Sequence, residues 1–418
     1  MPQLADDCFA FGGELMPAAE ALRLIETRTV ALPGTETVPL ASARERILAE
    51  PLVAARSVPP HDNAAVDGYA VYFDDLVDGA ETVLPVEGRA TAGHPLGHAA
   101  RRGAAVRVFT GAPMPDGLDT VFMQEDCREE AGRVRLPPGL KRGANRRRAG
   151  EDVTAGATVL VAGARLRPQE IGLAASLGVA ELRVYRRLRV ALLSTGDEVR
   201  EPGAPLPPGA IYDANRYALR ALLEGLGAEV TDLGIVRDDR AAIGSALARA
   251  AESHDLIVSS GGMSTGEEDH MKAAVEAQGR LHFWRLAIKP GRPVAMGQVG
   301  RVPFLGLPGN PVAVMVTFLV LARPLILRLA GAAEIAPRSF PAVSGFAYRK
   351  KPGRREFLRA RLESSADGGW IARKFPRDGA GILSSMVDSD GLVVLDEAQT
   401  SVAPGASVAF LPFREVID

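Results

Sequence analysis

One stretch of the sequence, residues 255–311, concentrates groups that bind anions. It begins with D-L-I-V-S-S, an apolar run typical of a buried strand, and this run leads into a turn that contains Gly261 and Gly262. Glycine accepts a positive φ, so such a turn can direct several backbone N–H groups at one anion. An ammonium, Lys289, and a guanidinium, Arg292, follow in L-A-I-K-P-G-R-P. The residues predict an oxyanion site, although glycine-rich turns also occur in sheets that bind nothing.

Three carboxylates, Glu198, Asp238 and Asp269, accompany this stretch. Each follows one of three successive predicted strands. The loops that follow parallel strands share one edge of a sheet, so the three side chains are predicted to project from the same edge. Acids beside an anion site repel the substrate unless a cation lies between them. Mg²⁺ binds carboxylate and phosphate oxygens, so the residues imply a divalent cation, with Mg²⁺ as the first choice.

Two of these acids have a plainer interpretation. Asp238 opens a predicted helix, where an N-cap contributes about 1 kcal/mol without any metal. Glu198 lies in a turn, and in the alternative interpretation its side chain is simply that of a solvent-exposed turn residue.

If Asp269 is a metal ligand or a catalytic acid, we expect Asp269→Asn to abolish turnover and to leave the fold intact. A large loss of thermal stability would instead indicate a structural role.

The elements that position these groups are predicted to form an α/β domain. From Leu188 onward, apolar strands alternate with helical segments, a pattern typical of a parallel sheet. The last helix begins at L-P-G-N-P, with Asn310 as N-cap and Pro311 at the first helical position, and its N–H groups predict a second anion site. Pro324 should kink or end that helix. The apolar run 312–322 is too short to span a bilayer and indicates a core helix.

The rest of the chain has weaker patterns. Residues 17–26 and 42–50 have helix-forming composition, and residues 51–55 resemble a strand. Short alternating strands between residues 81 and 135 predict a small β-rich domain. Short strands return after residue 340 and predict a small β-barrel or sandwich.

Several charged groups in these regions have two open interpretations. Asp62 and Asp67 follow a proline turn, where they either do chemistry or cap their own backbone. The run K-R-G-A-N-R-R-R at 141–148 is either a solvated basic surface or one wall of an anion site. Arg359 and Arg361 share one face of a predicted strand and meet either an anion or solvent.

Composition restricts the class of protein. The 418 residues suggest two to four domains, and 47% hydrophobic with 24% charged residues is typical of a soluble globular protein. A net charge of −2 gives no general attraction to nucleic acid or to an anionic membrane. Cys8 and Cys127 are too few and too far apart for a disulfide framework or a zinc site. No basic segment precedes an apolar run at the N-terminus, so we expect no signal peptide and a cytoplasmic location.

Eight segments, in order, resemble the molybdopterin molybdenumtransferases, the MoeA type that is also found as the E domain of gephyrin. The segments are D-N-A-A-V-D-G-Y-A-V, F-T-G-A-P-M-P, R-R-R-A-G-E-D, L-S-T-G-D-E, G-A-I-Y-D-A-N, S-S-G-G-M-S-T-G-E-E-D, K-P-G-R-P and L-P-G-N-P-V. Each motif alone is weak evidence, but the ordered set is highly specific.

The resemblance implies an elongated homodimer of four-domain chains, which combine α/β and β domains. The implied domains are an elongated N-terminal domain (1–56 and 148–186), an inserted β-rich domain (57–147), a parallel α/β domain of the molybdopterin-binding type (187–332) and a C-terminal β-barrel domain (333–418).

The activity implied by the resemblance is insertion of molybdenum from molybdate into adenylylated molybdopterin. AMP is released, and Mg²⁺ or another divalent cation assists. The site would lie between protomers, with Asp67 contributed by the second protomer. Asp67, Glu198, Asp238 and Asp269 would have catalytic roles, the last three as metal ligands. The implied substrate-binding residues are Thr110, Asp152, Gly261, Gly262, Ser264, Lys289, Arg292, Gly309, Asn310, Arg354, Ser384 and Ser385.

Two positions depart from the family's pattern. Arg292 stands where the family usually has lysine, so a planar fork replaces a point charge. Ala313 stands where many members have serine, so one hydroxyl donor is missing, and the preference between molybdate and tungstate stays open. Two rival functions also remain open, a molybdopterin adenylyltransferase-like enzyme and a non-catalytic scaffold or degenerate paralogue. For the main interpretation, an adenylyltransferase and a recipient molybdoenzyme are expected protein partners.

Overall fold

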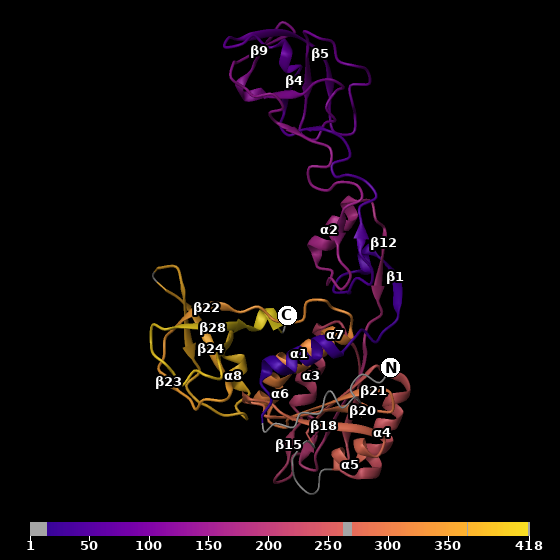
Figure 1. The fold of residues 1–418 in the computed structure, drawn as a ribbon, viewed down its shortest axis with the longest axis vertical. Coiled ribbons are helices and arrows are strands. Elements are labelled where there is room, and N and C mark those ends of the chain that lie inside the picture. Colours follow the sequence, from indigo (N-terminus) through magenta and orange to yellow (C-terminus); the bar gives the residue numbers. More distant parts are fainter. Residues whose placement is uncertain (1–14, 262–269, 366, 417–418) are drawn as a thin grey trace.

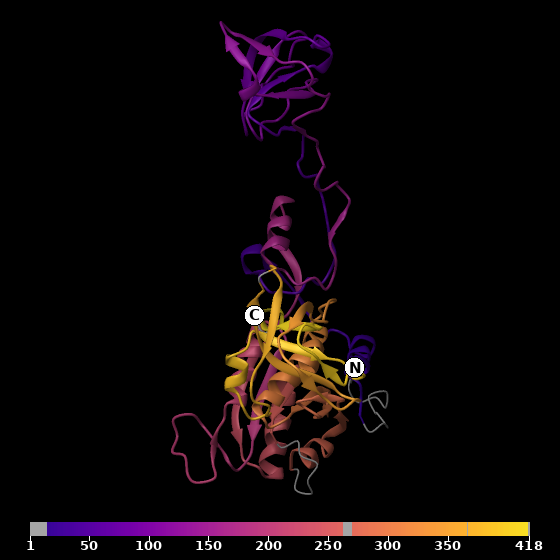
Figure 2. The same ribbon diagram turned by 90° about the vertical axis from the view of Figure 1, so that its left-hand side faces the viewer.

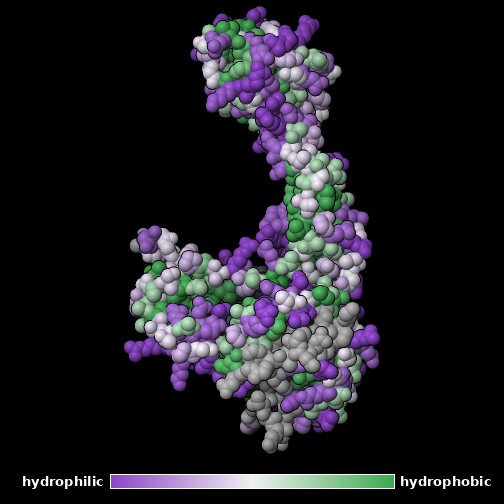
Figure 3. Space-filling view, in the orientation of Figure 1, coloured by the Kyte–Doolittle hydropathy of each residue, from purple (hydrophilic) through white to green (hydrophobic). Residues whose placement is uncertain are grey.

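The chain is elongated, with a large body at one end, a narrow stalk and a small β-rich unit at the other end (Figure 1). The same extension is seen after a 90° turn (Figure 2). The computed structural model describes residues 15–261, 270–365 and 367–416. Figure 3 shows hydrophobic residues gathered along the stalk, between the two ends.

A six-stranded sheet forms the centre of the body, in the order β16-β13-β17-β21-β20-β18. The first four strands are parallel, as the sequence predicts, whereas β20 and β18 extend the sheet through antiparallel pairs. The sheet is therefore mixed rather than wholly parallel. The bounds are β13 Arg189–Thr195, β16 Glu229–Val236, β17 Leu256–Ser260, β18 Gly279–Arg285, β20 Pro293–Val299 and β21 Val302–Leu307.

Helices cover both faces of this sheet. One buried cluster joins the sheet to α1, α3, α6 and α7, and a second joins the opposite face to α4 and α5. The central strands are thus buried on both sides, which explains their nearly continuous apolar sequences. The bounds are α1 Ala18–Arg28, α3 Asn215–Gly225, α4 Arg240–Ser253, α5 His270–Glu276, α6 Pro311–Thr317 and α7 Arg323–Leu329.

The helix after L-P-G-N-P shows how the predicted proline effect is realised. Between α6 and α7 the chain forms a π-helical turn, Phe318–Ala322, which ends two residues before Pro324. A proline removes one helical N–H and crowds the preceding turn, so the ladder is disrupted at that point. By length and composition alone, Pro311–Leu329 is apolar enough to cross a membrane, but 83% of its most apolar window is buried inside the protein. It is a core helix, as predicted.

The stalk is made of paired outgoing and returning segments. The pairs are β1 (Thr35–Pro39) with β12 (Glu181–Tyr185), β2 (Leu52–Val53) with β11 (Thr158–Leu160), and β3 (Asn63–Ala64) with β10 (Arg146–Arg147), beside helix α2 (Pro168–Ser176).

The helix expected over residues 42–50 is wrong. Leu40–Ser42 forms a single 3₁₀ turn, Glu45 has φ 63°, and Leu48 bridges Val184. A left-handed residue ends any helix at that point. Pairing with the returning chain therefore overrides the helix-forming composition of residues 42–50.

The far end carries the predicted β-rich unit, a sheet ordered β7-β4-β6-β5-β9-β8. Its bounds are β4 Gly68–Val71, β5 Thr82–Ala90, β6 Ala105–Val108, β7 Thr120–Met123, β8 Arg128–Glu130 and β9 Arg133–Leu136. Much of the basic run at 141–148 is paired inside this region: Arg142 contacts Asp74 and Asp119, and Arg146 lies 3.4 Å from Asp62.

The C-terminal strands form the predicted barrel, because β24 pairs with both β25 and β26 and so closes a ring of five strands. A further short strand, β19 (Ile288–Lys289), comes from the α/β part of the chain and pairs in parallel with β24. The body and the barrel are therefore joined by backbone hydrogen bonding. The bounds are β22 Phe340–Ser344, β24 Arg355–Ser364, β25 Trp370–Lys374, β26 Gly391–Leu395 and β28 Ser407–Pro412.

Candidate active site at the seam between the α/β sheet and the barrel

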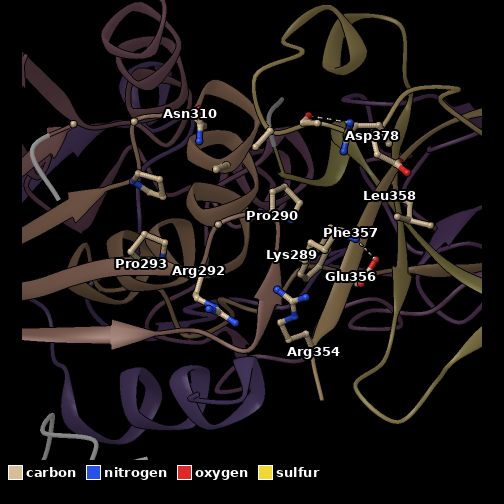
Figure 4. A pocket seen from close by; sticks show the side chains of 18 of the residues that line it. Lys289, Pro290, Arg292, Pro293, Asn310, Arg354, Glu356, Phe357, Leu358 and Asp378 are labelled. Atoms are coloured by element: carbon tan, nitrogen blue, oxygen red, sulfur yellow. Dashed lines mark hydrogen bonds and ion pairs between the residues drawn. The ribbon is translucent and has the colours of Figure 1, made fainter. Parts of the chain in front are cut away.

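A cavity of about 650 Å³ lies where the α/β sheet meets the barrel (Figure 4). Two predicted acids, Glu198 and Asp238, line it from the carboxyl ends of β13 and β16. Predicted substrate-binding residues also line it: Gly261, Lys289, Arg292, Gly309, Asn310 and Arg354.

The segment between β19 and β20 places the cationic groups. It leaves the barrel's sheet at Lys289 and enters the α/β sheet at Pro293, so Arg292 lies between the two. Gly291 has φ +100°, and a Cβ there would lie 2.2 Å from Oγ1 of Thr317. Only glycine allows this close crossing.

Arg292 and Arg354 differ in their pairing from the other cations that line the cavity. Within the described parts of the chain, neither guanidinium has an ion pair or a side-chain hydrogen bond, and in Figure 4 their side chains point to the same part of the cavity. Two like charges repel unless an anion joins them, and a guanidinium binds an oxyanion with two parallel N–H groups. The pair is therefore suited to an oxyanion that bridges the two guanidiniums.

Lys289 is held differently. Its Nζ donates to Glu356 Oε2 at 3.2 Å and to the Tyr348 hydroxyl at 3.3 Å. Burial lowers the pKa of Lys289, but the hydrogen bonds to Glu356 and Tyr348 outweigh burial, and the net pKa is raised. The amine therefore carries its charge at neutral pH.

The carboxylate edge has a geometry that separates two neighbouring acids. Asp239, not Asp238, caps α4, because its Oδ1 accepts from the N–H groups of Ala241 (3.1 Å) and Ala242 (2.8 Å). The interpretation of Asp238 as the helix cap is therefore wrong. Asp238 instead faces the cavity, and the Thr195 hydroxyl donates to it at 3.3 Å.

Glycines bring the strand ends close together. A Cβ at Gly261, where φ is +84°, would lie 2.6 Å from the carbonyl oxygen of Thr195. Asn215, which the sequence analysis did not single out although it lies in the I-Y-D-A-N segment, donates to Ser260 Oγ at 3.0 Å and to the Gly309 carbonyl at 2.7 Å. It ties two of the loops that line the cavity.

The N-terminus of α6 is partly used already. Asn310 occupies the predicted N-cap position, but its side chain makes no capping hydrogen bond. The next free amide, Val312 N–H, donates to the carbonyl of Ala380 at 2.9 Å. This end of the helix thus holds the barrel's loop, and fewer donors remain for an anion than the sequence suggests.

The two serines predicted near molybdate do not line the cavity. Ser385 is fully buried and accepts from Arg359 Nε at 3.0 Å, and Ser384 begins α8 (Ser384–Val387). Arg359 does line the cavity and donates to the carbonyl of Gly379 at 3.2 Å. Burial lowers the pKa of Arg359. Ser385 therefore bears on the site only through Arg359.

Asp67, Thr110 and Asp152 lie far from this cavity within one chain. Asp67 follows the stalk and precedes β4, at the opposite end of the molecule from β24 (Figure 1). Its Oδ1 accepts from both the N–H and the hydroxyl of Thr110 at 2.7 Å. These two bonds lower the pKa of Asp67, the backbone bond most strongly. Asp152 lies at the foot of this unit, where its N–H donates to Val58.

Replacing Thr110 tests the origin of this low pKa. We expect Thr110→Val to raise the pKa of Asp67 only part of the way, because the stronger backbone bond remains. The carboxyl carbon shift of Asp67, followed by NMR from pH 2 to 7, measures it. Thr154→Val is the matched control, since that hydroxyl contacts only a backbone carbonyl. An unchanged pKa in Thr110→Val contradicts the assignment.

Gly262, Ser264 and Asp269 lie outside the described residues, so the predicted third acid is not placed. Within residues 15–261, 270–365 and 367–416, no group of three His, Cys, Asp or Glu side chains is close enough to hold a metal ion. The described edge supplies two acids to the cavity.

Comparisons with known proteins fit this arrangement. Family models match the MoeA N-terminal region (domain I and II) over residues 16–178, a probable molybdopterin binding domain over 191–328 and the MoeA C-terminal region (domain IV) over 341–413. A molybdopterin molybdenumtransferase from Haemophilus influenzae is 40% identical over 92% of this chain and 95% of its own length. The chain belongs to the molybdopterin molybdenumtransferase family. The resemblance predicted from the motifs is confirmed.

A second relative and a solved structure are also similar to this chain over most of its length. The protein of that name from Nostoc sp. is 36% identical over 90% of this chain and 88% of its own. Among solved structures, a molybdopterin biosynthesis MoeA protein from Pyrococcus horikoshii OT3 is 28% identical, with a TM-score of 0.81 over 96% of this chain and 100% of that one. The predicted fold class, an α/β domain combined with β domains and a C-terminal barrel, is confirmed.

Proposed function

We propose that this protein inserts molybdenum from molybdate into adenylylated molybdopterin and releases AMP, in molybdenum cofactor biosynthesis. One observation carries the proposal: two guanidiniums without a described partner, Arg292 and Arg354, share a cavity with two acids, Glu198 and Asp238. Such a cavity suits a small oxyanion on one side and a metal-bound phosphate on the other. The names of the relatives support the same activity.

The cationic side is suited to molybdate, a dianion with only acceptor oxygens. Arg292 and Arg354 can each donate two parallel hydrogen bonds, and Lys289 adds a third charge. Ala313, which also lines the cavity, supplies no hydroxyl donor. Anion binding is therefore expected to depend on Arg292, Arg354 and Lys289. Arg359 also lines the cavity, but its guanidinium is held by Ser385 and by the carbonyl of Gly379.

The acidic side fits Mg²⁺, because this ion commonly takes one or two carboxylates together with phosphate oxygens and water. Glu198 and Asp238 would hold it, with Asp269 as the predicted third ligand. When bound, the ion would neutralise charge on the phosphoanhydride oxygens and ease the departure of AMP. Glu198 and Asp238 would hold it at the edge of the sheet, where the Thr195 hydroxyl donates to Asp238 at 3.3 Å.

A homodimer would complete the site. Asp67, Thr110 and Asp152 cannot reach the cavity of their own chain, so a second copy must bring them there for the predicted catalytic role of Asp67. The apolar surface along the stalk supports such a contact, since Val53 is 51% and Val161 62% exposed. The low pKa of Asp67 keeps that carboxylate charged, ready to orient a cation or a donor group.

The remaining features of the proposal follow from the family. The protein works in the cytoplasm, receives its substrate from a molybdopterin adenylyltransferase and passes its product to a molybdoenzyme. Its domain division is 1–56 with 148–186, 57–147, 187–332 and 333–418. A lone adenylyltransferase domain is not favoured, because family models match three successive regions of the chain.

Release of AMP tests the function directly. The purified protein is incubated with adenylylated molybdopterin, Mg²⁺ and molybdate, and AMP is quantified by chromatography. AMP should appear only when molybdate and the divalent cation are both present. A folded dimer that releases no AMP would support the scaffold alternative instead.

A further inference from the structure

Glu356 is a buried carboxylate in the wall of an anion cavity, and the proposed function gives it no role. Its side chain is only 2% exposed, and it lines the same cavity as Arg292 and Arg354. A negative charge at this place opposes the binding of every anion. The carboxylate of Glu356 must therefore serve a purpose other than direct binding of the anion.

The contacts of Glu356 supply that reason. Its Oε2 accepts from Lys289 Nζ at 3.2 Å and from the Tyr348 hydroxyl at 2.8 Å, and Lys289 also donates to that hydroxyl. A dashed line marks a contact of Glu356 in Figure 4. An ammonium has three N–H donors, so two are occupied and one remains for a ligand.

The backbone fixes the same pair. Lys289 and Glu356 are register partners in the parallel pair of β19 and β24, so their side chains leave the sheet on one face. Lys289 is followed directly by the segment that carries Arg292 into the α/β sheet. The register thus fixes where the Lys289 side chain leaves the barrel's sheet, although 45% of that side chain is exposed.

A fixed ammonium discriminates by size. Molybdate and tungstate are nearly equal in size, and both are larger than sulfate. If Lys289, Arg292 and Arg354 surround the dianion, a smaller ion leaves a wider gap to the ammonium, and closing that gap requires a movement of Lys289 that breaks its bonds to Glu356 and Tyr348. A larger dianion would leave a smaller gap and require less movement of Lys289.

We propose that Glu356 is a specificity-determining residue that acts by positioning Lys289, so that the cavity favours large tetrahedral dianions over sulfate. This inference rests on the proposed function, since it concerns the same oxyanion site. Glu356 weakens the binding of all anions by its charge and weakens that of small ones most.

Calorimetric titrations of the full chain with sodium molybdate, tungstate and sulfate test the inference. We expect Glu356→Gln to lower the ratio of the sulfate Kd to the molybdate Kd by about tenfold, chiefly through tighter sulfate binding. Tungstate should follow molybdate in every variant. Tyr348→Phe, which keeps the charge of Glu356, should lower the ratio by a smaller factor. The matched control is Glu363→Gln, an exposed carboxylate on the same strand that pairs with Arg373.

The outcomes separate the two ideas. If Glu356→Gln changes the molybdate and sulfate affinities by one common factor, the carboxylate acts only through its charge and the specificity role fails. An unchanged ratio in Tyr348→Phe also counts against positioning, and it does so even if Glu356→Gln does not fold. If the unmodified protein binds neither molybdate nor sulfate, the oxyanion site of the proposed function is itself wrong.

Discussion

Arg354→Met should lower the affinity for molybdate by about 10- to 100-fold, because it removes a charged donor that no other described side chain replaces. The melting temperature should stay within about 2 °C of the unmodified protein. Arg354 has no ion pair in the described parts of the chain, and its loss relieves repulsion from Arg292. Isothermal titration with molybdate and a thermal scan measure the two effects.

Arg355→Met is the matched control for this experiment. Arg355 is the next residue, but it does not line the cavity, and it pairs with Asp396 and Glu397 at 3.3 and 3.2 Å. We expect this variant to keep its affinity for molybdate. Equal losses in the two variants would mean that the strand, and not the Arg354 guanidinium, determines binding.

The α/β part of the site was predictable because its physics is local and periodic. Apolar strands that alternate with helices imply a parallel sheet, and the loops after parallel strands share an edge. That reasoning placed Glu198 and Asp238 together, and both line the cavity. It could not see the antiparallel β18 and β20, because strand direction depends on pairing rather than on composition.

The barrel's contribution was harder to predict from the residues alone. Lys289 meets Glu356 only because β19 leaves the α/β sheet and pairs with a strand that comes much later in the chain. No local sequence pattern predicts the pairing of β19 with β24. Glu356 and Tyr348 therefore had no signal in the sequence, whereas Arg354 was predicted to bind substrate only through the resemblance to the family.

The predicted N-cap of α4 was wrong by one residue. In D-D-R-A-A-I both aspartates are plausible helix caps, and a shift of one residue exchanges their roles. The structure gives the cap to Asp239, which has extended backbone angles of φ −130° and ψ 148° and two bonds to the first turn. Asp238 therefore does not cap the helix, and a substitution there can test its proposed role in metal binding without removing the cap.

Asp238→Asn should lower the rate of AMP release by about 100- to 1,000-fold, because a charge that would hold the proposed divalent cation beside the phosphoanhydride is lost. Raising the Mg²⁺ concentration should restore part of the rate, which a purely structural defect would not allow. The melting temperature should not change, since no helix cap is removed. AMP release at a series of Mg²⁺ concentrations, together with a thermal scan, measures the three expectations.

Asp239→Ala is the opposite case and serves as the control. It removes the cap of α4 and should cost about 1 kcal/mol of folding free energy, with little change in the rate of AMP release or in the Mg²⁺ requirement. The two neighbouring substitutions thus exchange their effects on stability and on turnover. If Asp238→Asn lowers the melting temperature and Asp239→Ala abolishes AMP release, the assignment of the two acids is reversed, and the proposed metal ligand at this edge of the sheet is Asp239 instead of Asp238.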